Sequence, residues 1–134
     1  MILLIDDNKF FCEMLKEYLK KNEFEIDYCL NVKTAIEYVK EKKNKIKLCI
    51  VDIILNGQSG FVFIDFLHKF NNENDYDIKY IFLTGCNQDL IYYKQIVEIM
   101  NSQDGKKYCY SYIVKDDFLF IKDSILQILN KFKI

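Results

Sequence analysis

The sequence predicts an α/β fold, with a doubly wound sheet of five parallel strands and five alternating helices. Short apolar runs such as residues 48–51 have the composition of strands that are buried on both faces of a parallel sheet. Between these runs, apolar residues recur at helical spacing, most regularly in the last segment, 118–132. A chain of 134 residues has the length of one domain and can bury a real core.

Each expected strand ends where polar or turn-forming residues begin. The first run stops at two aspartates, and the run 48–51 ends on Asp52 before a segment of Asn, Gly, Gln and Ser. Strands that alternate with helices are joined by right-handed crossovers and are therefore parallel. The five expected strands span residues 2–5, 24–29, 48–52, 79–83 and 110–114.

The helices are predicted from apolar periodicity and from capping residues. The first helix follows Asp7 or Asn8, either of which can cap it, and ends near Asn22. Segments 71–77 and 101–107 are polar and are predicted as loops. The remaining helices are expected over residues 32–39, 63–70, 89–100 and 118–132.

Composition excludes several classes of protein. The net charge of −1 gives no reason to expect a nucleic-acid or membrane surface, and no apolar stretch reaches the length of a membrane span. The chain begins in a strand-like run, so we expect no signal peptide. The five cysteines form no CxxC pair, and we expect reduced core thiols in a cytoplasmic protein. They are Cys12, Cys29, Cys49, Cys86 and Cys109.

Four of the five predicted strands end in polar side chains that can share one rim of the sheet. They are Asp6 and Asp7, Asp52, Thr84 and Lys115. Three carboxylates at about 4 Å would repel one another by about 4 kcal/mol per pair at an effective dielectric of 20. Such a cluster persists at a low energetic cost only if a cation lies within it, and carboxylate oxygens with room for water suit Mg²⁺. The rim of an open parallel sheet is also where ligands bind.

These residues resemble those of response-regulator receiver domains, the phosphoacceptor modules of two-component signalling, which have a flavodoxin-like fold. Gly60 lies eight residues after Asp52, at the family's loop glycine, and Tyr112 lies three residues before Lys115, at the aromatic switch position. The resemblance covers essentially the whole chain. It implies a single receiver domain over residues 1–134 with no output domain.

The resemblance also implies a chemistry for the rim. Asp52 is the expected phosphoacceptor, which attacks the phosphorus of a phosphohistidine or of a small phosphodonor. Asp7, Asp52 and the backbone carbonyl of Ile54 are expected to hold Mg²⁺, with Asp6 acting mainly through a bound water. Lys115 is expected to pair with a phosphoryl oxygen. Such a protein is not an enzyme in the usual sense, since it catalyses its own phosphorylation and slow dephosphorylation.

The resemblance further implies a switch and its partners. Thr84 is expected to hydrogen-bond the phosphoryl group, and Tyr112 to turn inward behind it, which changes a protein-binding surface. The expected partners are a histidine kinase or phosphotransfer protein and a separate target. In the family, the residues two positions after the phosphoacceptor and two after the hydroxyl can orient a hydrolytic water. Here these residues are Ile54 and Cys86, which hydrogen-bond water poorly or not at all, so we expect slow loss of the phosphoryl group.

The chain departs from the family pattern at three places. Gly57 and Asp116 stand where the family often has proline, which removes a rigid φ from each loop. The interval from Thr84 to Lys115 is longer than usual for the family, so we expect an extended fourth helix or exit loop.

Two alternatives remain open on the sequence. A pseudo-receiver would bind proteins without taking phosphate. An unrelated doubly wound enzyme or nucleotide binder would need a motif such as GxGxxG or GxxxxGK[ST], or a Ser/His/Asp or Cys/His set, and none is found. His68 is interpreted as a surface histidine. Tyr108, Tyr110 and Tyr112 suit core and switch packing better than a stacking platform for bases, since no basic patch accompanies them.

Overall fold

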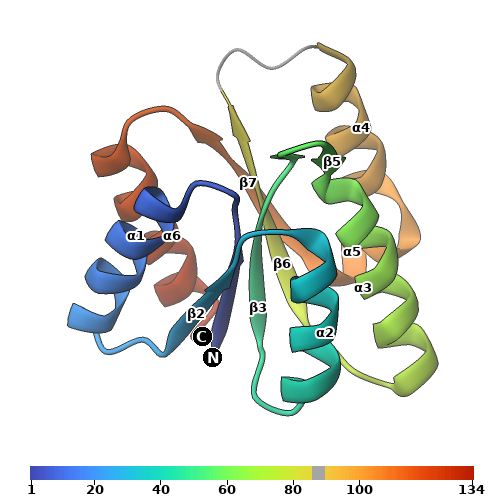
Figure 1. Ribbon diagram of the computed structural model, residues 1–134. Coiled ribbons are helices and arrows are strands. Elements are labelled where there is room, and N and C mark those ends of the chain that lie inside the picture. Colours follow the sequence, from blue (N-terminus) through green and yellow to red (C-terminus); the bar gives the residue numbers. More distant parts are fainter. Residues whose placement is uncertain (86–89) are drawn as a thin grey trace.

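The computed structural model describes residues 1–85 and 90–134. It contains one five-stranded parallel sheet with the strand order β2-β1-β3-β6-β7 (Figure 1). The predicted fold class is therefore confirmed. The order reverses between β1 and β3, which makes the carboxyl ends of these two strands the natural ligand crevice of the sheet. The strands span β1 Ile2–Ile5, β2 Ile26–Cys29, β3 Leu48–Asp52, β6 Lys79–Gly85 and β7 Cys109–Lys115.

Helices cover both faces of the sheet (Figure 1). Helices α1 and α6 pack on one face, and α2, α3, α4 and α5 pack on the other. The described part of the chain thus has six helices, one more than expected. Their bounds are α1 Lys9–Lys21, α2 Val32–Lys42, α3 Gly60–Asn74, α4 Leu90–Asn101, α5 Gln103–Tyr108 and α6 Phe118–Lys131.

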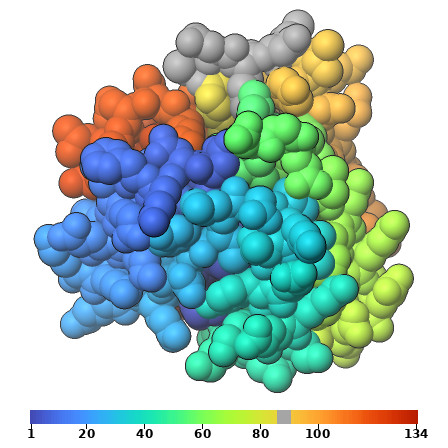
Figure 2. All heavy atoms as spheres, viewed as in Figure 1, coloured from blue at the N-terminus to red at the C-terminus, as the bar shows by residue number. Residues whose placement is uncertain are grey.

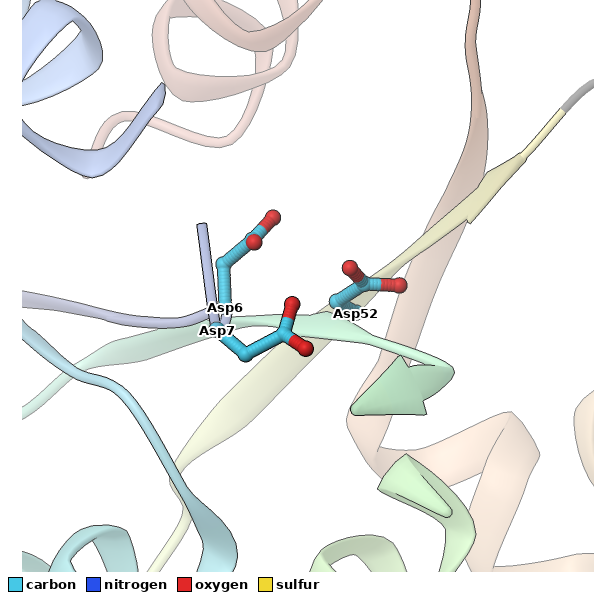
Figure 3. A group of neighbouring side chains, drawn as sticks. All are labelled: Asp6, Asp7 and Asp52. Atoms are coloured by element: carbon cyan, nitrogen blue, oxygen red, sulfur yellow. The ribbon is translucent and has the colours of Figure 1, made fainter. Parts of the chain in front are cut away.

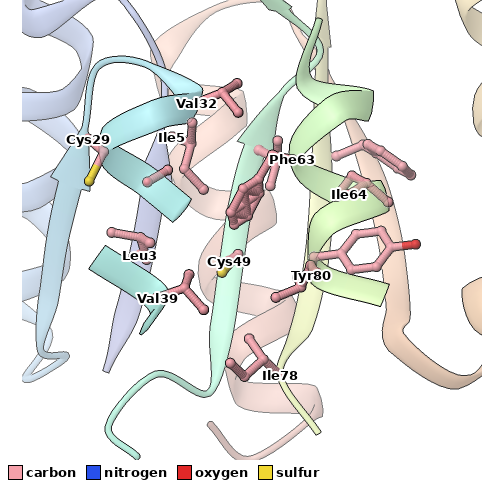
Figure 4. Packing of buried hydrophobic residues seen from close by; sticks show 14 of the residues in the cluster. Leu3, Ile5, Cys29, Val32, Val39, Cys49, Phe63, Ile64, Ile78 and Tyr80 are labelled. Carbon is pink, nitrogen blue, oxygen red and sulfur yellow. The ribbon is translucent and has the colours of Figure 1, made fainter. Parts of the chain in front are cut away.

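The two cores arise from the alternation of side chains along the central strands. Leu3 and Cys49 face the larger cluster, which is filled mainly from α2 and α3 (Figure 4). Ile2 and Leu48 face the other cluster, against α1 and α6. All residues of β1 and β3 are buried, which explains their apolar runs. Each large apolar side chain buried in this way stabilises the fold by about 1.5–3 kcal/mol.

The prediction of a loop over residues 101–107 is wrong, because α5 occupies most of this segment. Ser102 caps the helix and accepts a hydrogen bond from the Gly105 backbone N–H at 3.0 Å. A side chain at Gly105 would place its Cβ 1.7 Å from the Ile99 carbonyl oxygen, so only glycine allows α5 to pack against the end of α4. This short helix accounts for part of the long interval between β6 and β7.

The predicted loop over residues 71–77 is also partly wrong, because α3 continues to Asn74. Asn71 is buried, and its side chain satisfies both backbone groups of Ile78. The Asn71 amide donates to the Ile78 carbonyl at 3.0 Å, and its oxygen accepts from the Ile78 N–H at 3.1 Å. The helix ends at Asp75, whose left-handed φ of 59° reverses the chain.

The segment after β3 forms a small hairpin where a loop was expected. Strands β4 (Ile54–Leu55) and β5 (Gln58–Ser59) pair antiparallel around the two-residue turn Asn56-Gly57. Gly57 has a φ of 73°, a conformation that glycine adopts without strain. An Asn-Gly pair is a typical sequence signal for such a turn. The hairpin projects over the crevice between β1 and β3.

The described cysteines are free thiols. Cys12, Cys29 and Cys49 are buried and Cys109 is half-buried, while Cys86 lies outside the described residues. Burial raises the pKa of Cys12 to about 12, so it is an inert core thiol at neutral pH. Within residues 1–85 and 90–134, no helix has the length and apolarity that crossing a membrane requires.

Candidate functional site

Three carboxylates meet at the carboxyl ends of the neighbouring strands β1 and β3 (Figure 3). Asp6 and Asp7 follow β1, and Asp52 is the last residue of β3. One oxygen from each of the three lies within 4.8 Å of the others. Asp6 and Asp52 are buried and Asp7 is exposed, so the cluster opens to solvent on the Asp7 side. The parallel pairing of Ile5 with Val51 brings Asp6 and Asp52, 46 positions apart in the chain, close together.

Backbone N–H groups orient the two buried carboxylates. Asp6 Oδ1 accepts a hydrogen bond from the Asn8 N–H at 2.9 Å, and Asp52 Oδ1 accepts one from the Ile54 N–H at 3.1 Å. In both cases the donor lies two residues further along the chain, so each acid turns back onto the loop after its own strand. Ile54, proposed from the sequence as a backbone ligand, therefore borders the cluster, and its side chain is 47% exposed.

The hairpin holds the third carboxylate. Asp7 Oδ2 accepts a hydrogen bond from the backbone N–H of Asn56 at 2.8 Å. Because Asn56 belongs to the turn between β4 and β5, this bond ties the hairpin to the end of β1 across the crevice. Sequence patterns predicted neither this contact nor the hairpin that makes it.

Lys115 is the cation of the cluster. It ends β7, and its Nζ donates to Asp6 Oδ2 at 2.5 Å and to Asp52 Oδ2 at 3.3 Å. Burial alone would lower the pKa of Lys115, but the hydrogen bond to Asp6 and the two carboxylate charges outweigh burial and raise it. The side chain therefore remains an ammonium at neutral pH.

The raised pKa of Asp52 shows that the Lys115 ammonium does not fully offset burial and the negative charge around this carboxylate. Burial and the charge of Asp6 raise the pKa of Asp52 to about 6, although Lys115 and the Ile54 N–H act in the opposite direction. Three carboxylates face one ammonium, and the cluster supplies oxygen ligands only. Both its charge and its donor atoms fit a further cation such as Mg²⁺, which binds through few carboxylates and retained water.

Gly60 supports the backbone that carries Asp52. A Cβ at this position would lie 2.1 Å from the Asp52 carbonyl oxygen, which real structures do not tolerate. The Gly60 N–H also donates to the Ile53 carbonyl at 2.7 Å, and Ser59 caps α3 by accepting from the Phe61 N–H at 3.1 Å. The close approach of α3 to the end of β3 thus requires glycine, which gives a physical reason for this residue.

The two residues expected to form a switch lie on neighbouring strands. Thr84 is buried near the end of β6, one residue after Leu83, which pairs with Asp52. Tyr112 lies on β7 and is half-buried. Its ring is 5.9 Å from the ring of Tyr93 on α4, at an interplanar angle of 79°. Cys86, the second residue considered for control of hydrolysis, lies outside the described residues.

The interpretation of His68 as a surface histidine is wrong. Its side chain is only 13% exposed, and its Nε2 lies 2.8 Å from the Tyr80 hydroxyl. Its Nδ1 lies 3.9 Å from Asp104 Oδ2 on α5. Burial lowers the pKa of His68, against the opposing effect of Asp104 and Asp65. His68 therefore joins α3 to α5 on the side of the sheet away from α1.

Sequence reasoning also missed one contact of Lys115. Phe11 lies on the apolar face of α1 and is 7% exposed. Its ring centroid nevertheless lies 4.4 Å from the Lys115 Nζ. No sequence signal distinguishes this phenylalanine from others in an apolar helix face.

The doubly wound sheet thus carries an acidic cluster, a buried threonine and a lysine at its strand ends. The family model of the response regulator receiver domain matches residues 2–103, and the chain belongs to this family. It is thus a receiver domain of the two-component response regulator type, which is a signalling domain. Receiver domains generally bind Mg²⁺ in an acidic pocket, and the cluster of Asp6, Asp7 and Asp52 could hold such an ion.

Relatives and solved structures agree with this assignment. The chain is 30% identical over 88 residues to regulatory protein VanRB of Enterococcus faecalis, which covers 66% of this chain and 37% of that protein. It is 27% identical over 64 residues to two-component response regulator ORR26 of Oryza sativa subsp. japonica, covering 48% of this chain and 11% of that protein. The chain therefore corresponds to only a small part of each of these curated relatives.

The structural matches extend over nearly the whole chain. A two-component response regulator from Clostridium difficile has a TM-score of 0.67 at 26% identity and covers 98% of this chain and 96% of its own. The signal receiver domain of an HD domain-containing protein from Pseudomonas fluorescens Pf-5 has a TM-score of 0.72 at 21% identity, with 97% and 90% covered. The second match, at its lower identity, supports the fold alone.

Proposed function

We propose that this receiver domain takes a phosphoryl group on Asp52 in a Mg²⁺-dependent reaction. The observation that carries the proposal is the position of Asp52, a buried carboxylate at the end of β3 that accepts a hydrogen bond from Lys115 and lies beside two other carboxylates. A carboxylate that is both ionised at neutral pH and poorly solvated is a good nucleophile. The donor is a histidine kinase or a phosphotransfer protein of the same signalling system.

The reaction forms an acyl phosphate. An Asp52 carboxylate oxygen attacks the phosphorus, the phosphorus–nitrogen bond of a phosphohistidine breaks, and the histidine leaves with the bonding electrons. Lys115 pairs with a phosphoryl oxygen as the charge on Asp52 is consumed. Asp7, Asp52 and the carbonyl of Ile54 would hold Mg²⁺, and Asp6 would act through its water. When bound, the ion neutralises charge on the transferred group.

We further propose that Thr84 and Tyr112 couple the phosphoryl group to α4. Thr84 lies one residue past the strand partner of Asp52, and Tyr112 already contacts Tyr93 on α4. When the Thr84 hydroxyl moves to the phosphoryl group it leaves space behind it, and the Tyr112 side chain can turn inward into that space. The altered surface of α4 and β7 would act on a target protein. Thr84→Ala should leave phosphoryl uptake largely intact and weaken the response at α4.

We also propose a cytoplasmic location, which the free thiols of the described cysteines support. Loss of the phosphoryl group should be slow, because the exposed side chain at the rim is that of Ile54, which can neither donate to nor accept from a hydrolytic water.

The proposal is tested by intact mass after incubation with acetyl phosphate, with Mg²⁺ or with a chelator. The parent protein should gain one phosphoryl group only with Mg²⁺, and Asp52→Asn should gain none. Asp65→Asn, which changes an exposed aspartate on α3, is the matched control and should behave like the parent. A parent protein that gains no mass under any condition would favour the pseudo-receiver.

A further inference from the structure

Two different kinds of group contact the Lys115 ammonium, carboxylates and an aromatic ring. Asp6 and Asp52 bind its ammonium by ion pairs, and the ring of Phe11 lies 4.4 Å from the same Nζ. Phe11 itself is fixed by the edge of Phe118 on α6, with ring centroids 6.1 Å apart and planes at 87°. Figure 2 shows the start of α1, in blue, against the start of α6, in orange.

The low solvent exposure of Phe11 and Lys115 strengthens the attraction between the ammonium and the ring. An ammonium over an aromatic face is attracted by the quadrupole of the ring, and this attraction grows when water is excluded. Phe11 is 7% exposed and the Lys115 side chain is 22% exposed, so little water lies between them. The lysine side chain is otherwise a flexible four-carbon stem that loses considerable entropy when it is held in one place.

The proposed reaction changes the ion pairing of Lys115 but does not involve its contact with the Phe11 ring. In the proposed reaction an Asp52 oxygen becomes bonded to phosphorus, and the carboxylates also serve the metal ion. Lys115 therefore exchanges its ion pair with Asp52 for a contact with a phosphoryl oxygen. Phe11 carries no reacting atom and no ligand, so its contact can persist through the exchange.

We propose that Phe11 is a positioning residue for Lys115, which holds the ammonium at the rim while its anionic partners change. This inference rests on the proposed function for its effect on the rate, but its geometric part does not. It predicts that the ring face matters as well as the bulk of the side chain. A residue that only filled the core would be replaceable by any apolar side chain of similar size.

Three variants separate the two roles. Phe11→Leu keeps an apolar side chain and removes the ring face, whereas Phe11→Tyr keeps the ring. Phe63→Leu is the control for lost packing, because Phe63 is fully buried in the cluster on the opposite face of the sheet. Urea unfolding of all three shows how much stability each variant loses.

The first measurement is the NMR shift of the Lys115 ε-methylene protons in the unphosphorylated protein. The ring current of Phe11 should move these protons upfield in the parent, in Phe11→Tyr and in Phe63→Leu, and the displacement should vanish in Phe11→Leu. An unchanged shift in Phe11→Leu would overturn the inference, whether or not the protein takes phosphate.

The second measurement is the rate of phosphoryl uptake from acetyl phosphate. The rate constant at saturating donor should fall about tenfold in Phe11→Leu, as expected for the loss of a desolvated cation–π contact. The Mg²⁺ concentration for half-maximal rate should not change, and Phe11→Tyr should restore most of the rate. Equal losses in Phe11→Leu and Phe63→Leu would show a packing role only and overturn the inference. A parent protein without uptake would refute the proposed function, and the NMR result would still decide the role of Phe11.

Discussion

Replacing Asp52 with asparagine should stabilise the metal-free protein at neutral pH, because the native carboxylate is ionised there at a cost. Burial and the charge of Asp6 raise the pKa of Asp52 from 3.8 to about 6. At 1.36 kcal/mol per pKa unit, this shift corresponds to about 3 kcal/mol. Because this shift already includes the attraction of Lys115, we expect replacement by a neutral asparagine to gain about 1–3 kcal/mol.

The gain should depend on pH in a defined direction. Below about pH 4 the Asp52 carboxyl is neutral in the folded and the unfolded protein, so its shift contributes nothing to the difference between parent and variant. Between about pH 4 and pH 6 the unfolded state releases its proton first, and the parent loses stability relative to the variant. Above about pH 6 the carboxyl is ionised in both states, and the difference is constant.

The assay is urea unfolding of the parent and Asp52→Asn in chelator across this range. The difference in unfolding free energy should grow with pH and level off above about pH 6. Excess Mg²⁺ should then stabilise the parent more than the variant, because the ion binds the folded parent through Asp52. A difference that is independent of pH, or a variant that is less stable than the parent in chelator at neutral pH, would refute this account of the site.

Three further predictions test other parts of the structure, the first with a control substitution. Gly60→Ala should lose about 1–3 kcal/mol of unfolding free energy and slow phosphoryl uptake, because its Cβ meets the Asp52 carbonyl. Gly57→Ala is the control: its Cβ meets no atom within 4 Å, and it should lose only about 1 kcal/mol through its positive φ. The lowered pKa of His68 favours its neutral form in the fold, so the parent should lose unfolding free energy as the pH falls and this histidine becomes protonated. His68→Gln should lose less over the same pH range in urea unfolding, and equal losses would contradict this. Ile54→Asn should speed decay of the acyl phosphate about tenfold by orienting water, measured as loss of the mass adduct, and unchanged decay would show that this position does not control hydrolysis.

The fold could be predicted because its strongest signals are local. Apolar runs of strand length mark the buried strands, and polar residues mark their ends, so the order of the five strands of the sheet followed from the sequence alone. The two aspartates after β1 and Asp52 at the end of β3 could be assigned to one edge for the same reason. Parallel strands place their carboxyl ends together whatever lies between them in the chain.

The features that escaped prediction depend on tertiary contacts. Helix α5 is too short to be stable by itself and forms because Ser102 caps it and Gly105 allows it to approach α4. Asn71 is polar, yet it occupies a buried position because the backbone of Ile78 satisfies it. The contact between Phe11 and Lys115 joins residues that no local pattern relates.

The central claim is that Asp52 carries the phosphoryl group, and its chemical location is the most direct test. Protein treated with acetyl phosphate and Mg²⁺ is reduced with borohydride, which converts an aspartyl phosphate to homoserine, and is then digested for peptide mass spectrometry. The account predicts homoserine at position 52 in the parent and none when Mg²⁺ is chelated. Homoserine at another aspartate, with position 52 unchanged, would contradict it.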